Sequence, residues 1–247
     1  MVFVRGLLVS VALASAEPQA MLTHYSDAQC PCSARVPADV KLNFLDNPDF
    51  EGLVDFQQFF VGDLKKDVSK CIHGETECVA QRHFACAQKM SGDEVGGAAM
   101  PPYSQTSKWL DFEACSYGPC TNCAAILGKH CPCETYTDFT DYDKNDIMKN
   151  CSATFGLDWD ELHGCGTSDL GQQLMEVSSN RSNADGITYG ADGLAPYFLD
   201  GAKIKTRQLI PIVCGPVPKE VEKAVCAALA EKGHTPKACA TEETSLV

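Results

Sequence analysis

Fifteen cysteines constrain the fold of this 247-residue chain more than any other feature. All of them follow an N-terminal stretch that resembles a secretory leader, with a basic Arg5, a short apolar run and the small residues Ala14-Ser15-Ala16 before Glu17. That route leads to an oxidising compartment, so we expect most of the cysteines to form disulfides. Because their number is odd, at least one thiol is free, bonded to another molecule or only transiently paired.

We predict three segments in the chain, of which the leader is the first. Residues 1–16 form the signal peptide, residues 17–239 form one domain, and residues 240–247 form a disordered tail. Residues 116–145 are rich in cysteine and acidic side chains, and we interpret them as an insertion in that domain that disulfides cross-link internally. No later apolar run is long enough to cross a bilayer, so we expect no membrane insertion.

The charge balance excludes some partners. The chain has 20 basic and 33 acidic residues and a formal net charge of −13, a surface that repels nucleic acid and anionic membranes. Glycosylation sequons at Asn150 and Asn180 agree with a secretory route, which ends in a lysosome, a vacuole or the extracellular space. The sequence predicts no oligomeric state.

The stretch from His24 to Ser33 has the pattern of a short strand, a turn with two thiols and the start of a helix. Unpaired N–H groups and the dipole at a helix N-terminus favour an anion, so Cys30 would ionise at a lower pH than a free cysteine. Cys32 could then resolve the mixed disulfide that Cys30 forms with a substrate. The alternative is that both cysteines are structural and form permanent disulfides with other parts of the fold.

The residues that follow complete a strand–helix–strand unit. Apolar residues recur at helical spacing after Ser33 and predict a helix: Val36, Val40, Phe44 and Leu45. Residues 53–61 are aromatic and β-branched, which is typical of a strand. A close pair of cysteines on such a unit is the thioredoxin-like context, so we expect an α/β fold with a thioredoxin-like sheet flanked by helices.

Residues 71–86 carry a more specific pattern. Six positions match, at the right spacing, the signature Cys-Gln-His-Gly-x2-Glu-Cys-x2-Asn-x4-Cys: Cys71, His73, Gly74, Glu77, Cys78 and Cys86. The segment therefore resembles the gamma-interferon-inducible lysosomal thiol reductases, although Ile72 and Gln81 replace the two amide residues of that signature. We interpret these six residues as structural, with Cys78 and Cys86 linking a helix to neighbouring loops.

Three further blocks resemble the same family in order: residues 109–115, 151–175 and 193–201. The resemblance implies a thiol-disulfide oxidoreductase that reduces disulfide-bonded protein substrates. It needs no bound cofactor, and an external thiol such as glutathione or cysteine is the reductant. It also implies that Ala195 and Pro196 form a cis-proline strand end that positions the substrate.

The thiol pair departs from the family pattern. The family has Cys-x-x-Cys or Cys-x-x-Ser, whereas here Ser33 occupies the second position and Cys32 lies one residue earlier. Either Cys30 and Cys32 form a small disulfide ring, or Cys30 acts alone and an external thiol resolves the mixed disulfide. Both mechanisms make Cys30 the nucleophile.

Three alternatives compete with this interpretation. Cys120 and Cys123 have the usual redox spacing, but Tyr117-Gly118-Pro119 precedes them in place of a strand. His73 could bind zinc together with Cys71 and Cys78, but in an oxidising compartment we expect disulfides and no metal. The third alternative is a non-catalytic secreted binding module, cross-linked by disulfides, on the same fold.

The C-terminal half has the pattern of packed helices and a hairpin. We expect apolar helix faces at Leu162, Leu170, Leu174 and Val177. Asp200-Gly201 predicts a hairpin turn. Pro218 opens a helix that ends at Gly233, and its apolar face consists of Val221, Val225 and Leu229. Around that helix we expect disulfides to involve Cys214, Cys226 and Cys239.

Overall fold

The computed structural model describes residues 20–28, 33, 36–62, 67, 69–91, 108–117, 147–187, 197–204 and 219–240. Several predictions therefore fall outside the described residues. They concern the signal peptide, Cys30 and Cys32, the Cys120 and Cys123 pair, Ala195 and Pro196, Cys214, and the tail after Ala240.

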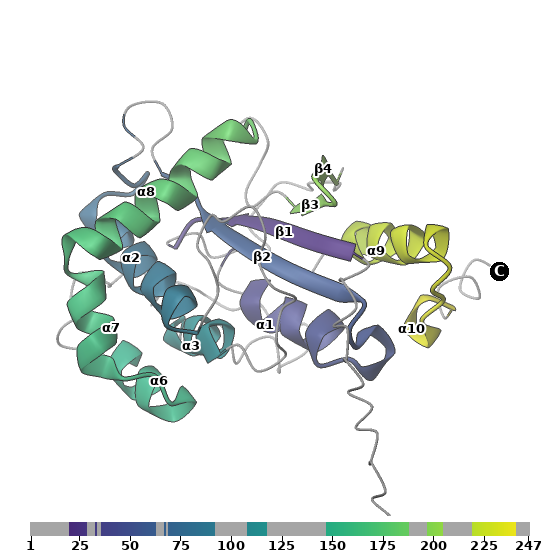
Figure 1. Cartoon of the computed structure of the whole chain (residues 1–247), viewed down its shortest axis with the longest axis horizontal. Helices are drawn as coiled ribbons and strands as arrows, with labels where there is room; N and C mark the ends of the chain where they lie inside the picture. The colour runs from purple at the N-terminus through teal and green to yellow at the C-terminus, as the bar shows by residue number, and fades with distance from the viewer. Residues whose placement is uncertain are drawn as a thin grey trace, which may run out of the picture.

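The centre of the fold is a four-stranded mixed sheet in the order β2-β1-β3-β4 (Figure 1). β1 (Ala20–Ser26) and β2 (Val54–Phe60) are parallel, with Ala20 opposite Val54 and Ser26 opposite Phe60. β3 (Tyr197–Leu199) runs antiparallel to β1, and β4 (Ala202–Lys203) returns antiparallel to β3. The predicted hairpin is confirmed, with Asp200 and Gly201 both at positive φ in its turn.

A helical crossover joins β1 to β2, as predicted. It consists of α1 (Val36–Val40), the π-helical turn η2 (Lys41–Leu45) and the short 3-10 turn η3 (Pro48–Phe50). The apolar residues whose spacing predicted this helix are all buried: Val36, Val40, Phe44 and Leu45. A parallel strand pair requires a crossover of this kind, so the local pattern of residues 20–61 determines this half of the sheet.

Among the described residues, five helices lie between β2 and β3 in the chain. They are α2 (Glu75–Met90), α3 (Lys108–Ser116), α6 (Ile147–Phe155), α7 (Trp159–Gly166) and α8 (Asp169–Ala184). Figure 1 shows them gathered at one end of the sheet, whereas α9 (Lys219–Glu231) and α10 (Lys237–Ala240) lie at the other end. Among the described residues, no helix is long and apolar enough to cross a membrane.

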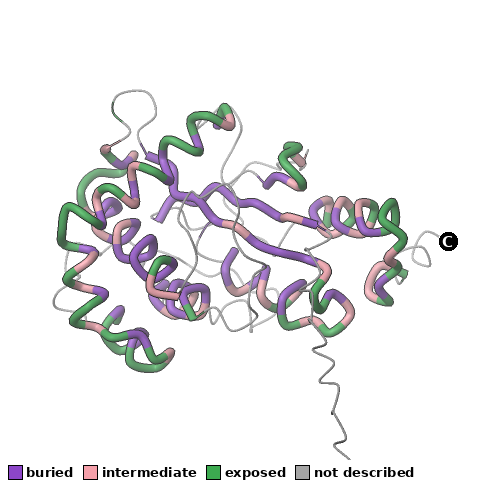
Figure 2. The backbone as a smooth tube through the Cα atoms, viewed as in Figure 1, coloured by how far each residue is buried: buried purple, intermediate pink, exposed green. Residues whose placement is uncertain are grey.

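All residues of β1 except Met21 are buried (Figure 2). Because side chains alternate between the two faces of a strand, both faces of β1 are buried. Leu22 belongs to the main core, which it shares with Phe56 and Phe60 of β2. Tyr25 points the other way and packs with Phe59 and Phe198 in a second cluster. Burial on both faces is typical of a strand in the middle of an α/β sheet.

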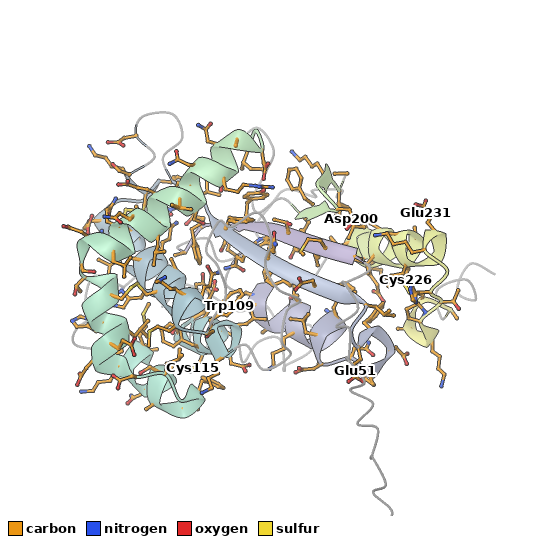
Figure 3. The ribbon with its side chains drawn as sticks, viewed as in Figure 1. Glu51, Trp109, Cys115, Asp200, Cys226 and Glu231 are labelled. Atoms are coloured by element: carbon orange, nitrogen blue, oxygen red, sulfur yellow. A yellow bond between two sulfur atoms is a disulfide. The ribbon has the colours of Figure 1, made fainter. Side chains whose placement is uncertain are left out.

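Four disulfides join described residues: Cys71 to Cys78, Cys86 to Cys165, Cys115 to Cys151, and Cys226 to Cys239. They lie at both ends of the molecule, as the positions of Cys115 and Cys226 in Figure 3 show. The predicted disulfide at the C-terminal helix is confirmed. Cys78 bonds to Cys71 in the segment before α2, whereas Cys86 joins α2 to another helix, α7, and not to a loop as predicted. These disulfides indicate an oxidising environment.

One expectation about helix faces is wrong. Leu162 is buried and Leu174 is partly buried, but Leu170 and Val177 are 41% and 43% exposed. The inner face of α8 instead carries one large apolar residue, Met175, and four small or polar residues: Gly171, Ser178, Ser179 and Ser182.

Two of these serines, Ser178 and Ser182, reach the edge of the sheet at β2, which is the outermost strand on that side among the described residues. The N–H of Phe60 donates to Ser178 Oγ at 2.6 Å, and Ser182 Oγ donates to the Phe60 carbonyl at 3.3 Å. From α2, Gln88 Nε2 donates to the Gln58 carbonyl at 3.3 Å. Polar side chains thus satisfy backbone groups of an edge strand, which explains why the inner face of α8 is not apolar.

Candidate active site

A hydrogen bond joins the two ends of the segment from Asp27 to Ser33, which we call the thiol segment because it contains Cys30 and Cys32. Asp27 follows β1 directly and is 2% exposed, and its N–H donates to Ser33 Oγ at 3.2 Å. Ser33 is fully buried and lies just before α1. The five residues between them include Cys30 and Cys32, which lie outside the described residues. The Asp27–Ser33 hydrogen bond therefore fixes where the thiol segment leaves the sheet and where it rejoins the fold.

The signature segment lies against the same end of β1. The Cys71–Cys78 disulfide links the residues before α2 to its first turn. Gly74, the N-cap residue of α2, has φ +99°, a conformation that side-chain-bearing residues rarely adopt. This turn places His73 and Glu77 four residues apart on one side, facing Asp27.

The three side chains form a cluster, which we call the Asp27 cluster: Asp27, His73 and Glu77. His73 Nδ1 lies 3.3 Å from Asp27 Oδ2 and 2.9 Å from Glu77 Oε2. The backbone N–H of His73 also donates to Glu77 Oε2 at 2.7 Å. On its other oxygen Glu77 accepts a 2.7 Å hydrogen bond from Gln81 Nε2. Gln81 thus acts as a polar partner of Glu77 at the position where it replaces the asparagine of the family signature.

Burial and charge shift the protonation of this cluster. The hydrogen bond to Asp27 and the charges of Asp27 and Glu77 raise the pKa of His73 to about 9, against the opposing effect of its burial. Burial and the negative charge of Asp27 raise the pKa of Glu77 well above its usual range. The side chain of Glu77 is fully buried, whereas that of His73 is 42% exposed. The contacts thus favour the charged form of His73, and burial beside a second acidic group favours the protonated form of Glu77.

The same three residues bear on the metal prediction. Among the described residues, they are the group of His, Cys, Asp and Glu atoms close enough to share a metal ion, with all three atoms within 4.8 Å of one another. Their oxygen and nitrogen atoms already accept or share hydrogen bonds with each other and with Gln81. The competing zinc site at Cys71 and Cys78 is wrong, because these two residues form a disulfide.

A second polar group lies on the other face of β1. His24 is fully buried on the same face of β1 as Leu22, opposite Gln58 of the neighbouring strand. Burial lowers its pKa to about 3, and the amide of Gln58 on the neighbouring strand offsets only part of that shift. Gln58 Nε2 donates to Glu113 Oε1 at 2.5 Å, and Tyr117 Oη donates to the same oxygen at 3.2 Å. Burial raises the pKa of Glu113 to about 8.

The structure describes some of the other predicted site residues but not all of them. β3 begins at Tyr197, whose ring lies 4.9 Å from that of His24, so the residue after Pro196 is adjacent to β1. Asn150 and Asn180 are exposed on α6 and α8, and their glycosylation stays a prediction. Sequence analysis missed the grouping of Asp27 with His73 and Glu77. The position of Asp27 three residues before Cys30 was visible, but its partners lie far along the chain.

No protein-family model matches the sequence, and no curated protein matches it. Solved structures do resemble this one. A candidate protein disulfide isomerase from Nitrosomonas europaea is 11% identical, with a TM-score of 0.50 over 86% of this chain and 98% of that one. A second from Pseudomonas syringae is 14% identical, with a TM-score of 0.48 over 86% and 94%. A thioredoxin-like oxidoreductase from Silicibacter pomeroyi is 16% identical, with a TM-score of 0.45 over 89% and 91%.

The fold is thioredoxin-like. The predicted fold class is confirmed, with a mixed sheet flanked by helices and several disulfides. In this thioredoxin-like fold the thiol segment joins the end of β1 to the beginning of α1, which is the position that the strand–turn–helix pattern predicted.

Proposed function

We propose that this protein is a thiol-disulfide oxidoreductase that reduces disulfides of protein substrates, with Cys30 as the nucleophile. One observation carries the proposal. The only cysteines between β1 and α1 of a thioredoxin-like fold are Cys30 and Cys32, on a segment whose ends the Asp27–Ser33 hydrogen bond brings together. A thiol before a helix N-terminus is favoured as a thiolate, and the thiolate is the attacking species.

The count of cysteines supports a thiol that is not permanently paired. Eight of the fifteen form the four described disulfides, which leaves seven, including Cys30 and Cys32. Seven cannot all pair with one another. An odd number leaves one thiol outside the permanent disulfides. This agrees with a single nucleophilic cysteine that forms a mixed disulfide during each catalytic cycle.

The reaction proceeds in two exchanges. The Cys30 thiolate attacks one sulfur of the substrate disulfide, a Cys30–substrate bond forms, and the other substrate sulfur leaves as a thiolate that takes a proton from water. Cys32 then attacks Cys30, which releases the second substrate thiol and leaves a Cys30–Cys32 disulfide. Two molecules of glutathione or cysteine reduce that disulfide and become disulfide-bonded themselves, so the two electrons come from the small thiol.

The second mechanism needs no Cys32. A molecule of the small thiol attacks Cys30 of the mixed disulfide and releases the substrate, and a second molecule frees Cys30 as the oxidised small thiol leaves. Ser33 Oγ accepts the Asp27 N–H, so the residue at the second position of the usual motif holds the segment together. This supports Cys32 or an external thiol, not residue 33, as the resolving group.

The family resemblance supports reduction as the direction and a lysosomal, vacuolar or extracellular site of action. The thiol reductase signature at residues 71–86 forms the turn that faces Asp27, at the end of the strand that leads to Cys30. The signature thus belongs to the surroundings of the thiol segment. An acidic destination agrees with carboxyl groups that keep their protons in the fold.

The test is reductase turnover on a disulfide-bonded protein at acidic and neutral pH with glutathione or cysteine as reductant. We expect Cys30→Ser to abolish turnover. If Cys32→Ser also abolishes it, the pair is the redox centre. If Cys32→Ser retains turnover with the small thiol, Cys30 acts alone. Full activity of Cys30→Ser would refute the proposal.

The competing function is a binding module in which Cys30 and Cys32 are both permanently paired. Four disulfides among the described residues show that cysteines serve as cross-links throughout this chain. Alkylation of the folded, unreduced protein separates the two functions. Modification of Cys30 by iodoacetamide supports the enzyme, whereas complete protection together with absent turnover supports the module.

A further inference from the structure

Both glycosylation sequons of the sequence lie on helices of the folded chain. The first, residues 150–152, is in α6, and the second, residues 180–182, is in α8. The asparagine of each sequon is exposed, so the fold has room for a glycan at either position. The serine of each sequon is fully buried: Ser152 and Ser182.

This burial means that a glycosyltransferase cannot read either sequon in the folded helix. The sequon consists of an asparagine and a hydroxyl two residues later, so the enzyme must contact both. Residues two apart on a helix do not face the same side. Ser152 Oγ also donates to the Lys149 carbonyl at 2.8 Å, and Ser182 Oγ donates to the Phe60 carbonyl at 3.3 Å. Glycosylation at either asparagine therefore has to precede the packing of its helix.

A covalent bond closes the first sequon. Its middle residue, Cys151, is buried and bonded to Cys115 of α3, which is labelled in Figure 3. Cys115 is 36 residues earlier in the chain, an interval of about 2–7 seconds at roughly 5–20 residues per second. The partner thiol is thus already present when Cys151 enters the oxidising compartment. Disulfides form there in seconds or longer, so disulfide formation and glycosylation compete for the same interval.

The second sequon is closed by non-covalent contacts. Its middle residue, Arg181, has Nε 2.7 Å from Asp185, and its guanidinium lies 5.7 Å from the centre of the Phe59 ring. Ser182 bonds to the edge of β2. These contacts require that α8 has formed and has packed on the sheet. The second sequon therefore remains accessible until this part of the fold is complete.

We propose that Asn180 is glycosylated in every molecule, whereas Asn150 is glycosylated only in molecules whose Cys151 is still a thiol when the transferase acts. The Cys115–Cys151 disulfide thus decides whether a molecule carries one glycan or two. The inference rests on the secretory route within the proposed function and not on the chemistry of Cys30.

Two reactions compete in this proposal. In glycosylation, the asparagine amide nitrogen forms a bond to the first sugar of a lipid-linked oligosaccharide. The bond from that sugar to the phosphate of the carrier breaks, and the amide loses a proton. In the competing reaction, the Cys115 and Cys151 thiols lose two protons and two electrons to a disulfide-bonded oxidant, which becomes a dithiol.

The measurement is the occupancy of each sequon in the full chain, expressed in a eukaryotic secretory cell. Enzymatic release of the glycans in heavy-oxygen water converts each glycosylated asparagine to a labelled aspartate, which mass spectrometry of the peptides counts. The total cell extract is used, so that molecules retained in the cell are included. We expect the ratio of occupancy at Asn150 to that at Asn180 to be below one in the unmodified protein.

The variants change only the disulfide. We expect Cys115→Ser to raise the ratio to one, and Cys226→Ser, which breaks the disulfide at α9, is the matched control that leaves it unchanged. Cys115→Ser leaves a thiol at Cys151 that other cysteines can bond. Cys151→Ser removes that thiol and keeps the sequon as Asn-Ser-Ser, and we expect the same rise. Dithiothreitol during synthesis tests the unmodified sequence and should also raise the ratio.

The outcomes separate this inference from the proposed function. Equal occupancy of the two sequons in the unmodified protein overturns the inference. An occupancy of Asn150 that neither variant nor dithiothreitol raises also overturns it, as does a chain without a glycan at Asn180. Reductase turnover of the purified protein and of Cys30→Ser tests the thiol chemistry independently, so either proposal can fail while the other stands.

Discussion

His24 is an ionisable side chain that the fold buries completely, on the face of β1 opposite to Asp27. Its pKa is about 3 in the fold and about 6.5 in an unfolded chain. Because the native state disfavours the proton, the stability that depends on neutral His24 is complete above pH 6.5. It is lost as the pH falls toward 3. Between pH 8 and pH 5 this group alone lowers the free energy of unfolding by about 2 kcal/mol.

We predict that His24→Phe removes this loss. Urea unfolding at pH 8 and pH 5 measures it, and the quantity to compare is the difference between the two pH values in each protein. Between pH 8 and pH 5, the free energy of unfolding should fall by about 2 kcal/mol more in the unmodified protein than in His24→Phe. The same difference in both proteins would show that His24 keeps an ordinary pKa.

Glu113 has the opposite effect from His24 on the pH dependence of stability. Its pKa is about 8 in the fold, so the native state favours the protonated carboxyl. The stability that depends on this proton is complete below about pH 4.5 and is lost as the pH rises toward 8, a change of about 3 kcal/mol between pH 5 and pH 8. Glu113→Gln keeps an acceptor for Gln58 and Tyr117 and does not titrate. We expect it to flatten the pH profile of thermal unfolding above pH 5, and an unchanged slope contradicts the assignment.

At the scale of elements, α8 shows why an apolar pattern can mislead. Leu170 and Val177 predicted an apolar face, yet Ser178 and Ser182 face the sheet because the edge of β2 needs hydrogen-bond partners. Sequence periodicity shows where hydrophobic residues recur along the chain, but it does not show which strand lies at the edge of a sheet. The strand–helix–strand unit of residues 20–61 was predictable because its pattern is local.

Ser178→Ala tests the role of α8 at the sheet edge. The variant leaves the buried N–H of Phe60 without its acceptor, and we expect a loss of about 1–2 kcal/mol in the free energy of unfolding. Ser179→Ala is the matched control, because Ser179 is equally buried and its hydroxyl has no hydrogen-bond partner among the described residues. Equal losses in the two variants would contradict this role.

The candidate site was only partly predictable from sequence. The thiol segment and the signature were each visible as short motifs. Their meeting was not, because Asp27 and His73 are brought together by a turn at Gly74 and the Cys71–Cys78 disulfide. A pattern search along one segment does not show that a carboxylate from β1 completes a histidine and a glutamate from another segment.

At the scale of the whole molecule, disulfides hold peripheral helices to the fold. Cys226 and Cys239 join α9 to the short helix α10, at a sequence separation of 13. We predict that Cys226→Ser with Cys239→Ser lowers the free energy of unfolding by about 2–4 kcal/mol. Reductase turnover of the folded variant should persist, because α9 and α10 lie at the other end of the sheet from α2, whose N-terminal segment carries His73 (Figure 1). Unchanged thermal unfolding would show that α10 contributes nothing to stability.

The topology of the sheet determines the order in which its strands can pair during synthesis. Met21 in β1 bonds to Asp200, 179 residues later, whereas β2 is available as soon as residue 60 has emerged. At roughly 5–20 residues per second, the ribosome takes on the order of 7–28 seconds to supply the missing strand. During that time the edge of β1 that β3 will cover is open to other chains.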